Sequence, residues 1–422
     1  MNRKNPNVPN PSNNFSAAGS LPKPTRVAVL FQRFGPYHHA RLNAAGQLLA
    51  VCGVEACGME STYAWDKVEG AAAFTRVTLT ERETDTREWR QELRRKMWRA
   101  LDDLKPHVVA VPGWSFVDAL SALEWCDANH TPAVVMSEST AWDERRTFWK
   151  EWIKTRLVKM NSAGLAGGTP HEKYLIQLGL APNRIFLGYD VVDNDYFQKQ
   201  ADAARADAQN LRQKFGLPGK YFLASARFVG KKNLFRLLQA YARHRELAEN
   251  KSAVWSLVLL GDGPLKPELK QLVADLKLDN CVQMPGFKQY HELPAYFGLA
   301  GAFIHASTTE QWGLVVNEAM ASGLPVLVSD RCGCAADLVS PGVNGFQFNP
   351  NDADELTQLL LKISAKTFPL ADFGAASRRI ISAWGPERFA AGLRDAVATA
   401  LKNPRPRLGW LDRTLLRLLL RR

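Results

Sequence analysis

Short apolar runs alternate with longer amphipathic stretches over most of the chain. Runs rich in Val, Ile, Leu and Phe predict buried strands. In the first half they lie at residues 26–31, 107–112, 133–136 and 163–168. A second series lies at residues 221–224, 256–261, 281–284, 301–307 and 326–329. Strands that alternate with helices are typical of parallel, doubly wound sheets. The pattern therefore predicts an α/β protein with two Rossmann-like domains that face one cleft.

The length of the chain supports two domains. It has 422 residues, 46% apolar and 23% charged, too long for one ordinary core. We expect domains at residues 25–199 and 200–384, a helix at 385–403 that packs back toward the first domain, and a basic amphipathic tail at 404–422.

Residues 1–24, rich in Asn, Pro and Ser, predict a disordered leader rather than a secretion signal. No apolar run approaches the roughly 18 residues of a membrane span, and six scattered cysteines suit a reduced, cytoplasmic protein.

Basic residues are concentrated in a few segments. The net charge is +12, and residues 89–99 and 145–159 are basic with interleaved tryptophans. No nucleic-acid motif accompanies them, so an anionic membrane or an acidic substrate is favoured over nucleic acid. In the Arg-rich tail, leucines 408, 411, 415 and 418 share one helical face. Two interpretations stay open: a peripheral anchor on an anionic membrane, or a helix docked on its own protein.

Two carboxylates, Glu310 and Glu318, flank the start of a predicted helix. The helix follows the strand at 301–307 and begins near Gly313. Its first N–H groups and positive dipole end suit a diphosphate. Glu310 would lie beside that anion and accept hydrogen bonds from hydroxyl groups, and Glu318 would reach a ribose. A sugar, a diphosphate and a ribose in a row describe a nucleotide-sugar.

The whole segment 308–326 resembles the donor-site motif of the retaining glycosyltransferases of family 4, which have the GT-B fold. Glu310 and Glu318 have the family's spacing, Gly313-Leu314 follows the first acid, and the unit closes with Glu-Ala-Met-Ala-Ser-Gly-Leu-Pro-Val. The resemblance extends from about residue 26 to about 403 and is strongest from 223 to 349. It implies that the C-terminal domain binds the donor and the N-terminal domain a variable acceptor. It also implies that the Gly313 and Leu314 amides hold the diphosphate.

Residues 226–234 are similar to the family's Arg-x4-Lys pair, here Arg227 and Lys232. The departing diphosphate develops negative charge, and without a metal these cations would stabilise it. Asn233 stands where the family commonly has Gly. Gly263 belongs to a turn that resembles the family's Gly-x-Gly-Pro, and Phe287 follows the segment that relatives place against the nucleobase.

In the first half, Gly35 occupies the position of the family's glycine-rich first loop, which by this resemblance lies against the donor phosphate and the acceptor, so Gly35 is a donor-binding candidate. Only one glycine is present in this loop, and the pattern G-x-G-x-x-G is absent, which argues against a dinucleotide-dependent oxidoreductase. His38, Glu138 and Asp143 are candidate acceptor contacts, because they follow predicted strand ends.

The leading hypothesis is a retaining, metal-independent glycosyltransferase without a cofactor, with Glu310, Arg227 and Lys232 as catalytic residues. It would move a sugar from a UDP- or GDP-sugar to a glycan or lipid-linked acceptor, in cell-surface polysaccharide or glycolipid assembly. Two alternatives remain: a GT-B sugar-nucleotide enzyme without transfer activity, such as an epimerase, and an inactive relative that acts as a binding partner.

Overall fold

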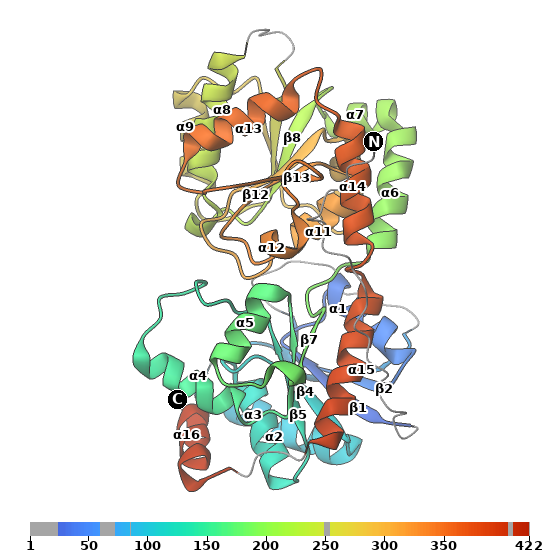
Figure 1. Ribbon diagram of the computed structural model, residues 1–422, viewed down its shortest axis with the longest axis vertical. Coiled ribbons are helices and arrows are strands. Elements are labelled where there is room, and N and C mark those ends of the chain that lie inside the picture. The colour runs from blue at the N-terminus through green and yellow to red at the C-terminus, as the bar shows by residue number, and fades with distance from the viewer. Residues whose placement is uncertain (1–23, 60–71, 85, 249–253, 404–407, 422) are drawn as a thin grey trace, which may run out of the picture.

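Two α/β domains are stacked along the long axis of the molecule (Figure 1). The computed structural model describes residues 24–59, 72–84, 86–248, 254–403 and 408–421. The leader predicted at residues 1–24 therefore lies, apart from residue 24, outside the described residues. None of the helices in the described ranges has the length and apolar character that a bilayer crossing needs.

The N-terminal domain is built on a parallel sheet of seven strands in the order β3-β2-β1-β4-β5-β6-β7. Its strands are β1 (Arg26–Phe31), β2 (Ala50–Met59), β3 (Thr75–Arg82), β4 (Val108–Pro112), β5 (Ala133–Ser137), β6 (Ala163–Ala166) and β7 (Ile185–Leu187). Its helices are α1 (Pro36–Gly46), α2 (Arg87–Leu104), α3 (Val117–Ala128), α4 (Phe148–Val158), α5 (Thr169–Gln177) and the 3-10 turn η1 (Pro182–Arg184).

The C-terminal domain repeats this plan with a parallel sheet of six strands in the order β10-β9-β8-β11-β12-β13. Its strands are β8 (Tyr221–Ser225), β9 (Ser256–Leu260), β10 (Val282–Gly286), β11 (Ala302–His305), β12 (Val326–Ser329) and β13 (Gly345–Phe348). Its helices are α6 (Asn194–Ala206), α7 (Ala208–Phe215), η2 (Gly230–Lys232), α8 (Leu234–Leu247), α9 (Lys266–Asp275), α10 (Leu293–Leu299), α11 (Leu314–Ala321), α12 (Ala335–Leu338), α13 (Ala353–Ser364) and α14 (Leu370–Ile381).

Each sheet is covered on both faces, which explains why its strands are apolar throughout. On one face of the N-terminal sheet, β1 and β4 form a core with α1 and with a helix from the far end of the chain, α15 (Pro386–Lys402). The other face packs against α2, α3 and α5. In the C-terminal domain, α6, α10 and α11 cover one face, and α8, α9 and α13 cover the other.

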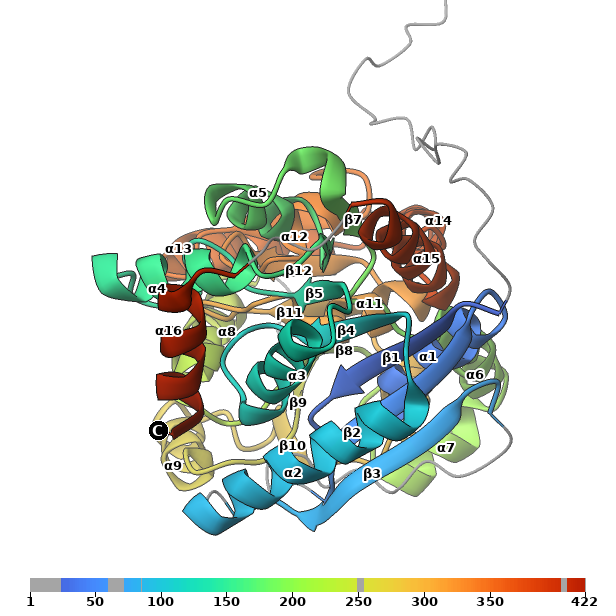
Figure 2. The same ribbon diagram turned by 90° about the horizontal axis from the view of Figure 1, so that it is seen from below.

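The chain crosses between the domains twice. It enters the C-terminal domain at α6, which packs on α10 and runs without a break through the boundary predicted between residues 199 and 200. It returns after α14, and α15 then packs against α1, β6 and β7. The last helix, α16 (Trp410–Arg421), lies against α3 and α4 on the outside of the N-terminal domain (Figures 1 and 2).

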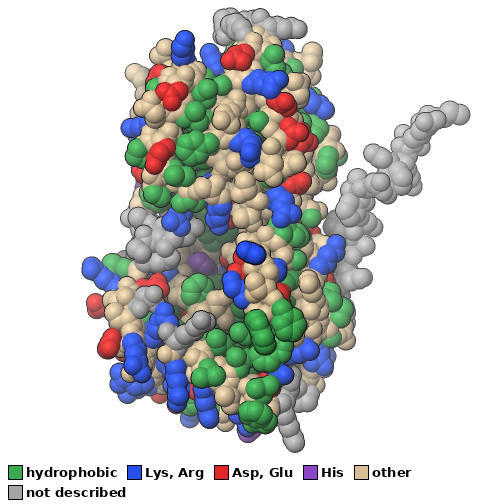
Figure 3. Space-filling view, turned by 90° about the vertical axis from the view of Figure 1, so that its left-hand side faces the viewer, with side chains coloured by type: hydrophobic (Ala, Val, Ile, Leu, Met, Phe, Trp, Pro, Cys, Tyr) green, Lys and Arg blue, Asp and Glu red, His purple; other side chains and the backbone are tan. Residues whose placement is uncertain are grey.

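The carboxyl ends of both sheets face the junction between the domains. Tyr37 on α1, next to β1, contacts Glu318 on α11, next to β11. Each sheet reverses its strand order at one point, between β1 and β4 and between β8 and β11. Ligands of open α/β sheets bind at such switch points. A hollow between the two domains is visible in the space-filling view (Figure 3).

Candidate active site

Glu310 lies in the loop between β11 and α11, at the switch point of the C-terminal sheet. The adjacent strand, β8, leads into a loop that ends in η2 and carries Lys231 and Lys232. The two loops are joined because the Thr308 N–H donates to the Lys231 carbonyl at 2.9 Å. The topology thus brings residues about 80 positions apart to one edge of the sheet.

The Glu310 carboxylate is held between cations and a histidine. Lys232 Nζ forms a close ion pair with its Oε2, Lys231 Nζ lies 3.8 Å from Oε1, and His305 Nε2 lies 3.5 Å from Oε2. Burial alone would raise the pKa of Glu310, but the hydrogen bond from His305 and the lysine charges outweigh it and hold the pKa well below its usual range. Glu310 is therefore ionised at neutral pH.

His305 donates to Glu310 as a neutral imidazole. Burial lowers its pKa, although the hydrogen bond to Glu310 opposes this. The Ser307 hydroxyl also donates to Glu310 Oε2 at 3.4 Å. The Glu310 carboxylate is thus fixed and charged, with two neutral and two cationic partners.

Arg227 lies on the same loop as Lys232, directly after β8, and its side chain is exposed. Asn233, where the family commonly has Gly, ends this loop with a left-handed φ of 58°. Asn is among the few residues that adopt this conformation readily. Its side chain also donates to the Ala306 and Pro350 carbonyls at 3.1 and 2.8 Å. The substitution therefore keeps the glycine-like backbone and ties the loop to β11 and β13.

Gly313 is the N-cap of α11 and has a φ of 104°. A Cβ at this position would find ordinary contacts, 3.4 Å from His305 Nε2 and 3.6 Å from Cys334 Sγ. The positive φ, not lack of space, therefore requires glycine here. The first N–H groups of a helix have no partner within it, so α11 offers those of Leu314 and its neighbours beside Glu310.

Glu318 is fully buried within α11. The Tyr37 hydroxyl from α1 of the other domain donates to its Oε1 in a short hydrogen bond, while its Oε2 has no partner among the described residues. Burial raises the pKa of Glu318 to about 8, and the Tyr37 hydrogen bond opposes this shift. Glu318, predicted to hold a ribose, thus contacts the N-terminal domain in this structure.

The two remaining donor-side candidates lie on loops that follow neighbouring strands. Gly263, with a φ of 156°, packs on the backbone of Phe228, because a Cβ there would lie 2.7 Å from the Phe228 carbonyl oxygen. This close approach fixes the loop that carries Arg227 and Lys232. Phe287 follows β10, and its side chain is partly exposed.

In the N-terminal domain, Gly35 and His38 form the turn that starts α1. The Gly35 N–H donates to His38 Nδ1 at 3.1 Å, and the imidazole lies against Phe31 with ring centroids 4.4 Å apart. Burial, helped by the nearby charge of Arg41, lowers the pKa of His38 to about 3. Because Nδ1 accepts a hydrogen bond, the neutral ring carries its proton on Nε2.

Glu138 lies directly after β5, and its carboxyl group interacts with that of Asp190. Burial raises the pKa of both carboxyl groups, and they hydrogen-bond to each other, with the charge of Arg41 opposing the shift. Arg41 Nη2 lies 3.6 Å from Asp190 Oδ1. The charge of Glu310 also raises the pKa of Glu138.

Asp143 is engaged within its own loop. Its Oδ2 accepts from the Thr140 N–H at 3.1 Å, and its Oδ1 forms a close ion pair with Arg146. Next to it, Trp142 Nε1 donates to the Arg331 carbonyl of the other domain at 3.3 Å. The loop therefore bridges the domains, and both oxygens of Asp143 support its shape.

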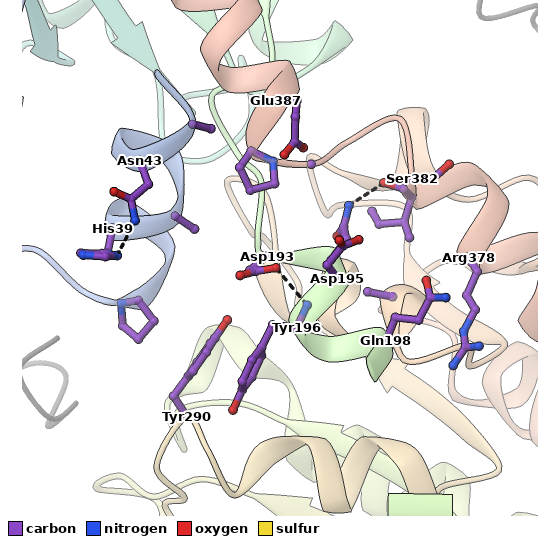
Figure 4. Close-up of a pocket in the computed structure, with 18 of the residues that line it drawn as sticks. His39, Asn43, Asp193, Asp195, Tyr196, Gln198, Tyr290, Arg378, Ser382 and Glu387 are labelled. Carbon is purple, nitrogen blue, oxygen red and sulfur yellow. Dashed lines mark hydrogen bonds between the residues drawn. The ribbon is translucent and has the colours of Figure 1, made fainter. Parts of the chain in front are cut away.

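A cavity of about 760 Å³ lies beside the Tyr37–Glu318 contact, between α1 and the start of α6 (Figure 4). Its walls include Asn43, Asp193, Tyr196, Tyr290 and Glu387. The Tyr290 ring stacks on Tyr196 with centroids 4.9 Å apart and meets the Tyr37 ring edge-on at 5.8 Å. This aromatic group separates the cavity from Glu318.

The structure adds Tyr37, His305, Lys231 and Asp190 to the residues predicted from the sequence. His305 ends a buried strand and Tyr37 opens a helix, so both resemble structural residues in the sequence alone. Lys231 had a detectable signal, because it neighbours Lys232 in the basic turn. Within the described parts of the chain, no group of three or more His, Cys, Asp or Glu side chains is arranged to hold a metal ion.

Residues 207–379 match the sequence profile of the family described as glycosyl transferases group 1. The alpha-monoglucosyldiacylglycerol synthase of Acholeplasma laidlawii is 34% identical over 158 residues, which are 37% of this chain and 38% of the relative. The amylovoran biosynthesis glycosyltransferase AmsK of Erwinia amylovora is 31% identical over 148 residues, 34% of this chain and 35% of the relative. The matched segments thus span just over a third of these relatives.

Solved structures with the same fold match nearly the whole chain. Anabaena HepE in complex with UDP and glucose has a TM-score of 0.68 at 18% identity, covering 88% of this chain and 98% of HepE. Sucrose-phosphate synthase from Thermosynechococcus elongatus has a TM-score of 0.68 at 16% identity, covering 88% and 97%. The predicted GT-B fold is confirmed by this likeness.

Proposed function

We propose that this chain, which belongs to the glycosyl transferases group 1 family through its C-terminal domain, transfers a glycosyl group from a nucleotide-sugar to an acceptor hydroxyl. The transfer would retain the anomeric configuration and require no metal ion. The observation that carries the proposal is Glu310, an ionised carboxylate fixed by Lys232 and His305 beside the N-terminus of α11. A carboxylate among hydroxyl-binding and anion-binding groups suits a sugar diphosphate.

The relatives support the same class of donor. HepE binds UDP and glucose, and two relatives are named as a glycolipid synthase and a polysaccharide glycosyltransferase. We infer a UDP-sugar as donor, and a glycan or a lipid-linked molecule as acceptor, for this chain as well.

Each residue would have a separate task in the reaction. Lys232, Arg227 and the first N–H groups of α11 would bind the diphosphate. Together they would stabilise the negative charge that develops on the diphosphate as it departs from the sugar. Glu310, released from Lys232, would accept hydrogen bonds from the sugar. His38 would donate from Nε2 to the reacting sugar or its phosphate. The acceptor would enter from the side of Glu138.

Calorimetric titration with UDP, GDP and ADP, with and without EDTA, tests the donor site. We expect micromolar binding of UDP that EDTA does not change. Lys232→Ala should weaken UDP binding about tenfold or more, because a charge-assisted contact to phosphate is lost. Lys96→Ala is the matched control, since Lys96 also pairs with a glutamate but on the outer helix α2.

The sugar contact is tested by comparing UDP with a UDP-sugar. Glu310→Gln should weaken the UDP-sugar more than UDP, since Glu310 would contact the sugar and not the nucleotide. Equal effects on both ligands would contradict this role. Chromatography of the products separates transfer from isomerisation of the donor, and NMR of the new linkage shows whether the configuration is retained.

A further inference from the structure

The three most exposed large hydrophobic side chains among the described residues lie on two adjoining helices. Phe148 and Trp149 begin α4 and are 75% and 71% exposed, and Trp410 begins α16 and is 77% exposed. The Phe148 and Trp149 ring centroids are 5.4 Å apart. Exposed aromatic side chains on adjoining helices indicate a surface that is covered in use.

The two helices are fixed to each other. Arg156 Nη1 of α4 lies 2.6 Å from Asp412 Oδ1 of α16, and Arg413 Nε of α16 lies 2.8 Å from Asp127 Oδ2 of α3. Leu408 and Leu416 are buried in the core of the N-terminal domain. The leucine face predicted for the tail is thus partly used to dock α16 on its own protein, while Leu418 is exposed.

Exposed basic side chains lie on the same two helices and beside them in the sequence. Arg145 precedes α4 and Lys150 follows Trp149, and both are exposed, as are Lys159 at the end of α4 and Arg417 of α16. Figure 2 shows α4 projecting from the molecule with α16 beside it. Lys and Arg side chains gather on the lower part of the face shown in Figure 3, on which the hollow between the domains also opens.

We propose that the start of α4 and α16, with Phe148, Trp149 and Trp410, forms the surface by which this protein binds an anionic lipid bilayer. Trp and Phe partition into the interface between headgroups and acyl chains, and the flanking Lys and Arg are complementary to anionic headgroups. We favour a bilayer over a protein partner because exposed cations accompany the aromatic residues on both helices.

This surface leads into the candidate active site. The segment that begins α4 starts at Glu138 on the cleft and passes Trp142, which contacts the other domain. A bilayer bound at α4 would therefore lie at the mouth of the cleft. If the proposed transferase function is correct, the acceptor belongs to the class of membrane-borne molecules whose hydroxyl groups lie at the headgroup level.

The test is co-sedimentation with vesicles of phosphatidylcholine and phosphatidylglycerol at 7:3, compared with phosphatidylcholine alone. We expect binding to the anionic vesicles and at least tenfold weaker binding of the double variant Phe148→Ala and Trp149→Ala. Arg145→Glu with Lys150→Glu should also weaken it, by about fivefold or more for each charge lost. Leu247→Ala removes an exposed side chain of the C-terminal domain and is the matched control.

Unchanged binding of the aromatic double variant would overturn the proposal, as would equal binding to both types of vesicle or none to either. The variants change exposed residues, and their circular dichroism should equal that of the wild type. The assay uses no nucleotide. A failure of UDP titration with intact vesicle binding would therefore contradict the proposed function alone, and the reverse result would contradict this surface alone.

Discussion

Replacing Glu318 by Gln should make the protein more stable at alkaline pH while it weakens the donor site. Glu318 is buried, Tyr37 donates to one of its oxygens, and the other has no partner among the described residues. Gln has the same shape, still accepts from Tyr37, and carries no charge. The substitution therefore removes the cost of ionising a buried carboxyl group.

The size of the effect follows from the pKa of Glu318, which burial raises from an ordinary value of 4.5 to about 8. Between these values the folded state holds a proton that the unfolded state has released, so the free energy of unfolding falls as pH rises. At about 1.4 kcal/mol for each pH unit, the loss between pH 5.5 and 8.5 is roughly 3 kcal/mol. Above pH 8 the loss is complete.

The assay is urea unfolding of wild type and Glu318→Gln at pH 5.5 and 8.5. Other groups titrate equally in both proteins. The difference in unfolding free energy between the two proteins therefore changes with pH only because of Glu318. We expect the variant to gain roughly 3 kcal/mol relative to wild type over this interval, and Glu268→Gln, at an exposed position, to gain nothing. The reasoning would be refuted if the two proteins differed in unfolding free energy by the same amount at both pH values. At pH 8.5, where the Glu318 carboxyl is ionised, the UDP affinity of Glu318→Gln should fall about tenfold or more, because a ribose would lose a charged acceptor.

Two further substitutions test contacts made by residues outside the predicted site. Tyr37→Phe removes the hydroxyl that occupies Glu318, so UDP should bind roughly threefold to tenfold more tightly in calorimetry. Weaker binding would mean that Tyr37 contacts the donor itself. Leu416→Ala opens a cavity where α16 is buried against the N-terminal domain, and should cost roughly 2–5 kcal/mol of unfolding free energy in urea. A change below 0.5 kcal/mol, where surface substitutions fall, would show that α16 contributes little to the fold.

Most strands could be predicted from the sequence, but β2, β3, β7 and β13 could not. β2 carries Glu55 in its centre, which interrupts the apolar run. In the structure Glu55 is fully buried, because Arg76 of β3 and its neighbour Thr78 contact its Oε1 at 2.8 and 2.6 Å. An ion pair between adjacent strands allows a charged residue in a core position. The sequence alone does not show that Arg76 is the partner of Glu55, because the two residues meet only when β2 and β3 pair in the sheet.

The same distinction separates the predicted and unpredicted parts of the site. Glu310 and Lys232 follow strand ends, and parallel topology brings such loops together, so their proximity could be expected. The contact of Tyr37 with Glu318 joins residues 281 positions apart in two different domains. It depends on how the domains are oriented, which no local pattern encodes. Likewise, the periodicity of the tail left open which helices α16 would cover, since a leucine face fits a bilayer and a protein core equally well.

The path of α15 has a consequence for biosynthesis. This helix supplies Phe389, Leu393 and Val397 to the core beneath the first strands of the chain. During translation, β1 stays without this helix until α15 is made about 360 residues later, after the C-terminal domain has been synthesised. The N-terminal domain is the first to be synthesised and the last to be completed. A premature stop after α14 would leave an apolar sheet face uncovered, and such a product would aggregate even though every residue of the candidate active site is present.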